Sequence, residues 1–130
     1  MTKKQLSQLY WLDREIQNQE ERLAALELEA RNIVSKLSDM PKKQGVSDKI
    51  GTLAGEIADL KALINLNIQK RWYERNQIIR YIMAVDDSLM RQILIARFVD
   101  GKNWLQVAES VGGHNTADSV KKACYRFLKK

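Results

Sequence analysis

The chain has few of the residues that interrupt helices or cross-link a fold. Its 130 residues include one proline, six glycines, one cysteine and one histidine. A single cysteine, Cys124, excludes an internal disulfide and a CxxC metal or redox motif, and we expect it to fill apolar space. Because no window approaches the roughly 20 uncharged apolar residues of a membrane span, and the first residues lack a signal-peptide core, we expect a cytoplasmic protein without a membrane partner.

Motifs of catalysis and cofactor binding are also missing. The patterns GxxxxGK, GxSxG and HExxH do not occur. The acidic pair Asp86–Asp87 has no histidine or third carboxylate nearby in sequence, so its position before Ser88 favours a helix N-cap over an acidic site. His114 stands in a glycine turn without a second ligand. The sequence therefore predicts a protein that is not an enzyme, with no catalytic residues, no metal ligands and no cofactor.

Positive charge is present in excess, and it is unevenly distributed. The net charge is +6. Residues 1–40 carry −1, residues 41–85 carry +4 and residues 86–130 carry +3. This distribution favours a polyanionic partner for the second and third parts of the chain.

The first 40 residues have the pattern of a coiled-coil helix. No glycine or proline occurs between residues 3 and 40, and apolar residues recur at heptad spacing. The two heptad tracks are Leu9, Ile16, Leu23, Ala30, Leu37 and Leu12, Gln19, Leu26, Ile33, Met40. Only Gln19 is polar among these ten positions. Met40–Pro41 ends the pattern, because the residue before a proline avoids the helical region.

A second long helix is predicted over about residues 48–84. Residues 41–46 are expected to form a loop, and Ser47 or Asp48 to cap the helix. The expected apolar seam consists of Ile50, Leu53, Ile57, Leu60, Ile64, Ile68, Trp72, Arg75, Ile79 and Ile82. Its spacing slips from seven toward eleven between Ile64 and Trp72, which predicts a locally relaxed supercoil.

Two helices of similar length joined by a short loop favour an antiparallel hairpin within one chain. A turn near Gln44 places Gln19 level with Asn67 and Gln69, where a polar layer would fix the pairing. Six apolar residues lie outside the seam and are expected to pack either on the C-terminal domain or on a second copy in a homodimer through the hairpin; they are Tyr10, Trp11, Leu28, Val34, Leu63 and Leu66. Residues 70–75 interleave basic and aromatic side chains, which suits the junction with a globular domain or an auxiliary nucleic-acid surface.

Residues 86–130 read as three short helices separated by tight turns. An almost wholly apolar helix over 89–99 precedes the turn 100–103, where Asn103 can cap a helix that ends at Gly112–Gly113. The last helix begins near Asn115–Thr116 and has Val120, Ala123, Cys124 and Phe127 on one face. From Ser119 onward it has five cations and no acid. A helix with one apolar and one cationic face, following a glycine turn and another short helix, is typical of a DNA recognition helix.

The residues expected to contact DNA lie on or beside this cationic face. Lysine and arginine suit phosphates and the guanine acceptors of the major groove, and Asp118 can accept from a cytosine amine. Thr116 or Asn115 would cap the helix and contact phosphate, whereas Tyr125 either joins the interface or packs on a neighbouring element. The predicted DNA-binding set is Thr116, Asp118, Ser119, Lys121, Lys122, Tyr125, Arg126 and Lys129.

Residues 94–112 resemble the helix-turn-helix of the sigma-70 region 4 superfamily. The resemblance rests on Arg97–Phe98, the turn Asp100–Gly101, the helix start at Trp104 and the closing Gly112, with residues 116–120 similar to the start of the recognition helix. The turn over 112–115 is about two residues longer than in those domains. Ala117 and Asp118 stand where arginine and glutamate often read bases.

The whole chain is similar to small helical phage and prophage proteins of Gram-positive bacteria, whose nearest functional analogues are late transcription regulators of the ArpU and RinA kind. The resemblance implies a DNA-binding transcription regulator in the cytoplasm of a bacterial host cell, with double-stranded DNA as partner and host RNA polymerase as a candidate second partner. Two alternatives remain: an adaptor whose hairpin engages a protein, and a DNA-packaging accessory.

Together these observations predict an all-α protein in two parts. Residues 1–85 are expected to form a long antiparallel two-helix coiled-coil hairpin, with helices over about 3–40 and 48–84. Residues 86–130 are expected to form a three-helix helix-turn-helix domain.

Overall fold

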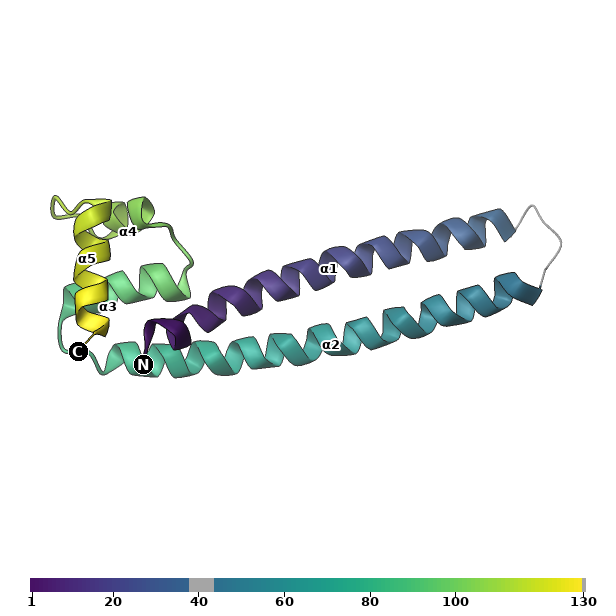
Figure 1. Ribbon diagram of the computed structural model, residues 1–130, viewed down its shortest axis with the longest axis horizontal. Coiled ribbons are helices and arrows are strands. Elements are labelled where there is room, and N and C mark those ends of the chain that lie inside the picture. Colours follow the sequence, from purple (N-terminus) through teal and green to yellow (C-terminus); the bar gives the residue numbers. More distant parts are fainter. Residues whose placement is uncertain (38–43, 130) are drawn as a thin grey trace. The chain divides into compact units, whose positions relative to one another are not determined.

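The computed structural model describes residues 1–37 and 44–129, and within these ranges it contains helices and turns but no strand. The first two helices are long, α1 (Lys3–Leu37) and α2 (Gln44–Met83). They are followed by α3 (Ser88–Leu94), the π-helical segment η1 (Ile95–Val99), α4 (Trp104–Val111) and α5 (Ala117–Leu128) (Figure 1). The predicted all-α fold, a two-helix hairpin followed by a helical domain, is confirmed.

The chain divides into two compact units that do not follow the order of the helices. One unit comprises residues 14–69, the middle part of the hairpin. The other comprises residues 1–13 together with residues 70–130. The predicted boundary near residue 85 separates α2 from α3 along the chain, whereas the compact units divide both long helices.

Within residues 14–69, side-chain pairs show that α1 and α2 run in opposite directions. Asn67 Nδ2 donates to Gln19 Oε1 at 3.0 Å, and Lys61 Nζ lies 3.6 Å from Glu27 Oε1. Asn67 is the buried polar residue of this layer, with 4% of its surface exposed. The predicted pairing of Gln19 with Asn67 is therefore confirmed, whereas Gln69 is exposed and lies outside the layer.

The heptad seam of α1 is also confirmed for the residues that the structure describes. Its apolar positions from Leu9 to Ile33 are all buried or half-buried. Leu37 and Met40, the last positions of the two tracks, lie outside the residues whose side chains are described.

Ile82, at the end of the predicted α2 seam, is buried as expected, but the course predicted between Ile64 and Ile82 is wrong at Trp72. Trp72, expected inside, is 53% exposed, while Asn67 and Ile78 are buried and Arg71 is half-buried. The heptad spacing thus continues without a slip, through positions occupied by polar side chains. The polar residues have partners across the hairpin, since Arg71 Nε donates to Asp13 Oδ1 in the unit that contains both. Periodicity of apolar residues alone could not follow this part of the seam.

The start of α2 also differs from the prediction. The helix begins at Gln44, so Ser47 and Asp48 lie inside it and are not its caps. Gly45 lies inside the first turn of this helix, and its cost of about 1 kcal/mol is one that a long helix can absorb. The rest of the predicted loop, residues 41–43, lies outside the described residues.

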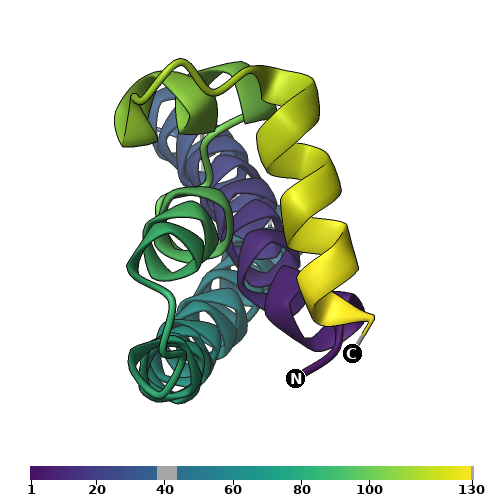
Figure 2. The ribbon, with the colours of Figure 1, turned by 90° about the vertical axis from the view of Figure 1, so that its left-hand side faces the viewer.

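One hydrophobic core holds the unit of residues 1–13 and 70–130 together. It includes Leu6 and Leu9 from α1 and Ile78 and Ile82 from α2, all at most 1% exposed. The short helices contribute the remaining buried members: Met90, Ile93, Leu94, Ala96, Phe98, Val107, Ala108, Val120 and Cys124. Figure 2 shows the first turns of α1 beside α5. The short helices therefore share their core with the ends of both hairpin helices.

Local signals position the short helices as predicted. Asp87 caps α3 by accepting from Leu89 N–H at 3.1 Å, which confirms the N-cap interpretation of the acidic pair. Asn103 caps α4 in a capping box with Gln106. The predicted helix over 89–99 continues from α3 into η1, where Asp100 N–H donates to the Ile95 carbonyl at 2.9 Å. The π-helical geometry of this last turn has no signal in the sequence.

Candidate nucleic-acid interface

The N-terminus of α5 is closed by a reciprocal cap. Thr116 Oγ1 accepts from Ser119 N–H at 3.1 Å, and Ser119 Oγ accepts from Thr116 N–H at 2.9 Å. Ser119 Oγ also donates to the Thr116 carbonyl at 3.0 Å. Thr116 is thus the N-cap, as the sequence predicted, and both hydroxyls are engaged in holding the helix start.

One face of α5 is anchored in the core. Val120 and Cys124 are at most 1% exposed, and Ala123 and Phe127 are half-buried against the same core. Burial raises the pKa of the Cys124 thiol to about 11, although the cations Arg97 and Lys3 act in the opposite direction. The apolar face predicted from the sequence is therefore the face that fixes the orientation of the helix.

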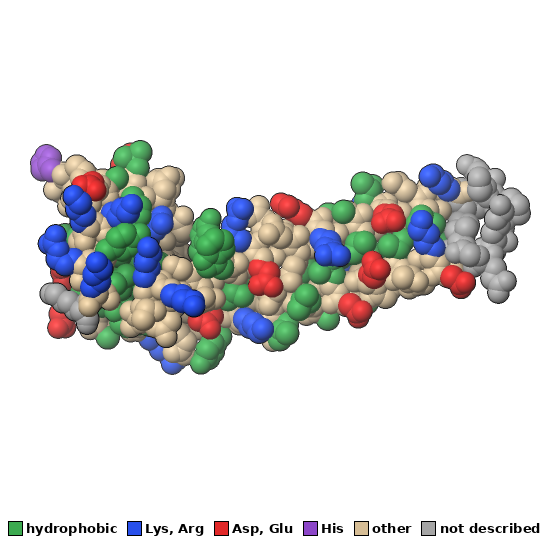
Figure 3. All heavy atoms as spheres, viewed as in Figure 1, with side chains coloured by type: hydrophobic (Ala, Val, Ile, Leu, Met, Phe, Trp, Pro, Cys, Tyr) green, Lys and Arg blue, Asp and Glu red, His purple; other side chains and the backbone are tan. Residues whose placement is uncertain are grey.

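The opposite face of α5 is cationic and open to solvent. Lys121, Lys122, Arg126 and Lys129 are all exposed. Figure 3 shows a group of Lys and Arg side chains over α5, where they outnumber the acidic ones. Lys122 Nζ lies 2.9 Å from Asp118 Oδ2, but both side chains are about two-thirds exposed or more. An exposed i, i+4 pair contributes little stability, so Lys122 can exchange this carboxylate for another anion.

Tyr125 packs on neighbouring elements of the protein, which is one of the two alternatives that the sequence left open. Its ring is half-buried and meets Trp104 of α4 edge to face, with ring centroids 5.7 Å apart and planes at 84°. Lys3 Nζ lies 4.2 Å from the centre of the same ring, and Lys121 Nζ lies 6.0 Å from it. Tyr125 therefore connects α5 with α4 and with the first turn of α1.

The turn between α4 and α5 depends on left-handed backbone conformations. Gly112, Gly113 and His114 all have φ between 63° and 67°. Asn115 Nδ2 donates to the Gly112 carbonyl at 2.8 Å and closes the turn. Glycine takes this conformation readily, whereas His114 adopts it at a cost in free energy because it has a side chain. The predicted glycine C-cap of α4 is confirmed.

The structure adds a residue that sequence reasoning missed. Lys3 lies 122 positions from Tyr125 in the chain, yet its ammonium sits over the tyrosine ring. No local pattern links these positions, because the contact depends on how α1 packs on the short helices. The basic and aromatic segment over residues 70–75 stays apart from this contact: Trp72 and Tyr73 are exposed, with Arg75 5.5 Å from the Trp72 ring centre.

Neither a metal site nor a membrane span is found in residues 1–37 and 44–129. No group of three or more His, Cys, Asp or Glu side chains is placed there to hold a metal ion. None of the helices in these ranges has both the length and the apolar character needed to cross a bilayer.

Comparison with known proteins gives no relative: no family model, no curated protein and no solved structure matches the chain.

Proposed function

We propose that the chain binds double-stranded DNA through the exposed face of α5 and acts as a phage-type transcription regulator. The observation that supports this proposal is the division of α5 into two faces. Val120 and Cys124 fix the helix in the core, and four cations are left in solvent on the other side. A helix held in this way presents a rigid row of positive charge of the kind that enters a major groove.

The geometry before α5 supports the same function. A short turn over residues 112–115 and the N-cap Thr116 join α4 to α5, and each of the two helices begins with a capping box. This is the arrangement of a helix-turn-helix, in which the first helix supports the second. The capped N-terminus of α5 adds the positive end of the helix dipole to the cationic side chains, which favours a phosphate near Thr116.

Duplex binding by α5 should depend on salt and on its lysines. With four phosphate contacts, the slope of log affinity against log salt concentration is expected to be about −3 to −4. Replacing Lys121 and Lys122 together by glutamate should weaken binding at least about tenfold, because two attractive contacts become repulsive. Fluorescence anisotropy with a labelled duplex measures both quantities.

The matched control is the double variant Lys36→Glu/Lys49→Glu, which changes the net charge by the same amount at two exposed lysines in residues 14–69. This variant should bind duplex DNA nearly as well as the unchanged protein. Equal losses in both double variants would attribute binding to net charge alone and would contradict a specific role for α5.

A protein-binding role for the hairpin is the second candidate. Leu63 and Leu66, at i and i+3 on α2, are each nearly half exposed, and Leu28 of α1 is 54% exposed. Exposed apolar side chains on a helical face suit a partner helix, such as a second copy of this chain or a subunit of the host polymerase. In Leu63→Ser/Leu66→Ser, loss of regulation with retained duplex binding would favour this role.

A further inference from the structure

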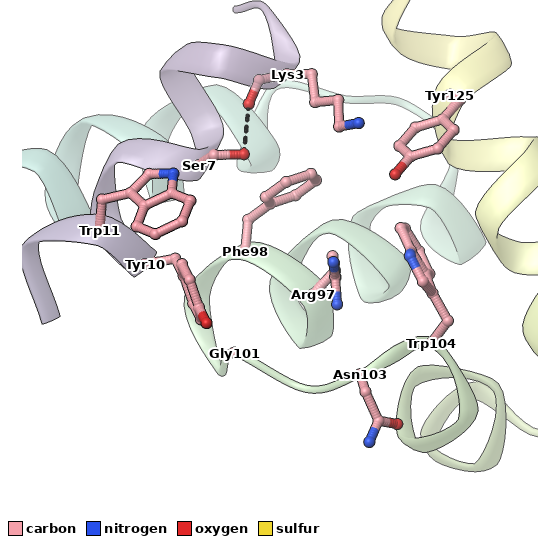
Figure 4. Close-up of a pocket in the computed structure, with 10 residues that line it drawn as sticks. All are labelled: Lys3, Ser7, Tyr10, Trp11, Arg97, Phe98, Gly101, Asn103, Trp104 and Tyr125. Carbon is pink, nitrogen blue, oxygen red and sulfur yellow. Dashed lines mark hydrogen bonds between the residues drawn. The ribbon is translucent and has the colours of Figure 1, made fainter. Parts of the chain in front are cut away.

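A cavity of about 400 Å³ lies within the unit of residues 1–13 and 70–130. Its walls come from the first turns of α1, from η1 and the turn after it, from the start of α4, and from Tyr125 of α5 (Figure 4). Its volume is in the range of pockets that hold small organic ligands. The exposed lysines of α5 do not line it, although Lys121 Nζ lies 6.0 Å from the ring of Tyr125, which does.

The cavity walls are unusually rich in aromatic rings. Tyr10, Trp11, Phe98, Trp104 and Tyr125 all line it. Tyr10 and Trp11 meet edge to face with centroids 5.1 Å apart and are 49% and 61% exposed. Large rings left this open on the rim of a cavity offer flat surfaces on which another ring can stack.

The charge of the cavity is entirely positive. Lys3 and Arg97 line it, and no Asp or Glu does. Neither cation takes part in an ion pair with a described residue; both lie instead over rings, Lys3 on Tyr125 and Arg97 on Trp104 at 4.6 Å. Arg97 uses one N–H to hold the Lys102 carbonyl at 3.0 Å, and a guanidinium has five such donors. Donors therefore remain for an anion.

Asn103 adds a neutral polar group at the edge of the cavity. Its Oδ1 accepts from Gln106 N–H in the cap of α4, and its Nδ2 donates to no atom of the described residues. The cap fixes the amide, so that its N–H donors have a defined direction. An amide held in this way can bond to the polar edge of a heterocycle or to an oxygen.

We propose that this cavity binds a nucleotide, with its base stacked on the Tyr10–Trp11 rim and its phosphate held by Lys3 and Arg97. Flat rings beside cations, with no carboxylate, match a ligand that combines a flat heterocycle with an anionic group. An acidic peptide would satisfy the charge but would leave the open rings without a stacking partner. The nucleotide is either a free mononucleotide or an unstacked residue of a single strand, and this site does not require duplex binding by α5.

Tryptophan fluorescence can test the proposal directly. In Trp72→Phe, which removes an exposed tryptophan outside the cavity, the two remaining tryptophans, Trp11 and Trp104, both line it. We expect adenosine monophosphate, or a short single-stranded oligonucleotide, to quench this fluorescence saturably. Adenosine without its phosphate should bind at least about tenfold more weakly, since it lacks the charge-assisted contacts.

Matched variants locate the ligand. Lys3→Gln should weaken binding about tenfold, whereas Lys4→Gln, at the adjacent exposed lysine, should not. Trp11→Ala in the full chain should abolish binding measured by equilibrium dialysis, while Trp72→Ala, at a similarly exposed tryptophan, should retain it. Circular dichroism on each variant confirms that the fold is kept, and the exposure of Lys3 and Trp11 makes both replacements compatible with folding.

Each outcome decides the proposal. Saturable binding of the monophosphate, lost in Trp11→Ala, supports a free nucleotide as ligand; binding of the oligonucleotide alone, with the same loss, supports a nucleotide of a single strand. Binding of neither ligand, or binding that Trp11→Ala leaves unchanged, overturns the proposal. Lys122→Glu/Lys129→Glu, which leaves Lys121 beside Tyr125 unchanged, should lose duplex binding and keep nucleotide binding, so failure of the cavity site and failure of the duplex-binding face are distinguishable.

Discussion

At the scale of single residues, the buried amide pair Gln19–Asn67 shows how one polar layer can set the pairing of two long helices. Asn67 is almost completely buried, and its side-chain donor reaches Gln19 across the hairpin. A shift of the two helices would leave this donor without an acceptor in an apolar seam, which costs more than the hydrogen bond itself contributes. The main effect of the pair is therefore to make alternative registers of the hairpin less stable than the observed one.

We expect Gln19→Leu to lower the free energy of unfolding by about 1–3 kcal/mol, because it leaves the Asn67 amide buried and unpaired. Gln17→Leu, the same change at an exposed position two residues away, should alter it by less than about 0.5 kcal/mol. Urea unfolding followed by circular dichroism measures both. The double variant Gln19→Leu/Asn67→Leu should recover most of the loss, and equal stabilities of the two single variants would count against the polar layer.

Cys124 predicts a pH dependence whose sign follows from its burial. Desolvation raises its pKa from 9.0 to about 11, so the folded protein holds the thiol proton more tightly than the unfolded chain. This contribution to stability is complete below pH 9 and is lost as the pH rises through about 11. The difference in free energy of unfolding between the unchanged protein and Cys124→Ala, measured by urea unfolding, should therefore shrink as the pH rises from 9 to about 11.

Alkylation of Cys124 gives a second measurement. At pH 9, about half of an unfolded thiol is ionised, against about 1% of a thiol with a pKa near 11. Iodoacetamide should react with the folded protein at least about 50-fold more slowly than with the urea-unfolded chain. Rapid labelling of the folded protein would show that α5 does not stay packed on the core.

At the scale of the helices, α5 depends on its N-cap. Thr116→Val keeps the shape of the side chain but removes the acceptor for Ser119 N–H, and we expect a loss of about 1 kcal/mol. Thr52→Val is the control: its hydroxyl donates to the Asp48 carbonyl inside α2 and caps nothing. Thermal unfolding should show a lower midpoint for Thr116→Val alone, and similar midpoints would argue against the capping box.

Local signals in the sequence predicted most helices, and they failed where packing overrides local preference. The caps at Asp87, Asn103 and Thr116 follow from side chains that bond to their own backbone, so the sequence alone indicates them. The seam of α2 between Ile64 and Ile82 cannot be predicted in this way, because Asn67 and Arg71 occupy seam positions through hydrogen bonds to partners on α1. For the cavity residues Tyr10 and Trp11, the sequence left open packing on the C-terminal domain or on a second copy, and nothing in it indicated that Arg97 and Trp104 lie around the same cavity.

At the scale of the whole molecule, the short helices do not form a core of their own. Leu6, Leu9, Ile78 and Ile82 are fully or almost fully buried in the same core as α3, η1, α4 and α5. Sequence reasoning placed these residues in a separate hairpin, because apolar periodicity shows that a residue is buried but not which distant segment covers it. The contact between residue 3 and residue 125 escapes local analysis for the same reason.

This shared core predicts that α1 stabilises the packing of α3, η1, α4 and α5. Leu6→Ala should cost about 2–5 kcal/mol, because it removes a completely buried side chain. Leu28→Ala, on the same helix but 54% exposed, should cost less than about 1 kcal/mol. Unfolding monitored through tryptophan fluorescence distinguishes the two variants, and a Leu6→Ala protein as stable as Leu28→Ala would show that α1 contributes no packing there.

A fragment of residues 86–130 tests whether the short helices can fold without α1 and α2. It contains α3, η1, α4 and α5, but it lacks the four buried side chains from α1 and α2 that complete their core. A chain this short already buries too little surface for secure folding. The loss of four buried aliphatic side chains, at a few kcal/mol each, is larger than the free energy of unfolding of a small domain.

We expect the fragment to show little helical circular dichroism and no cooperative thermal transition at a temperature where the full chain is folded. Because an unfolded fragment cannot hold the cations of α5 in a row, the duplex binding that we propose for α5 should be weaker in the fragment, although the fragment keeps the net charge of +3. A stably helical fragment would instead make the helix-turn-helix an independent domain, with α1 and α2 as an appendage to it.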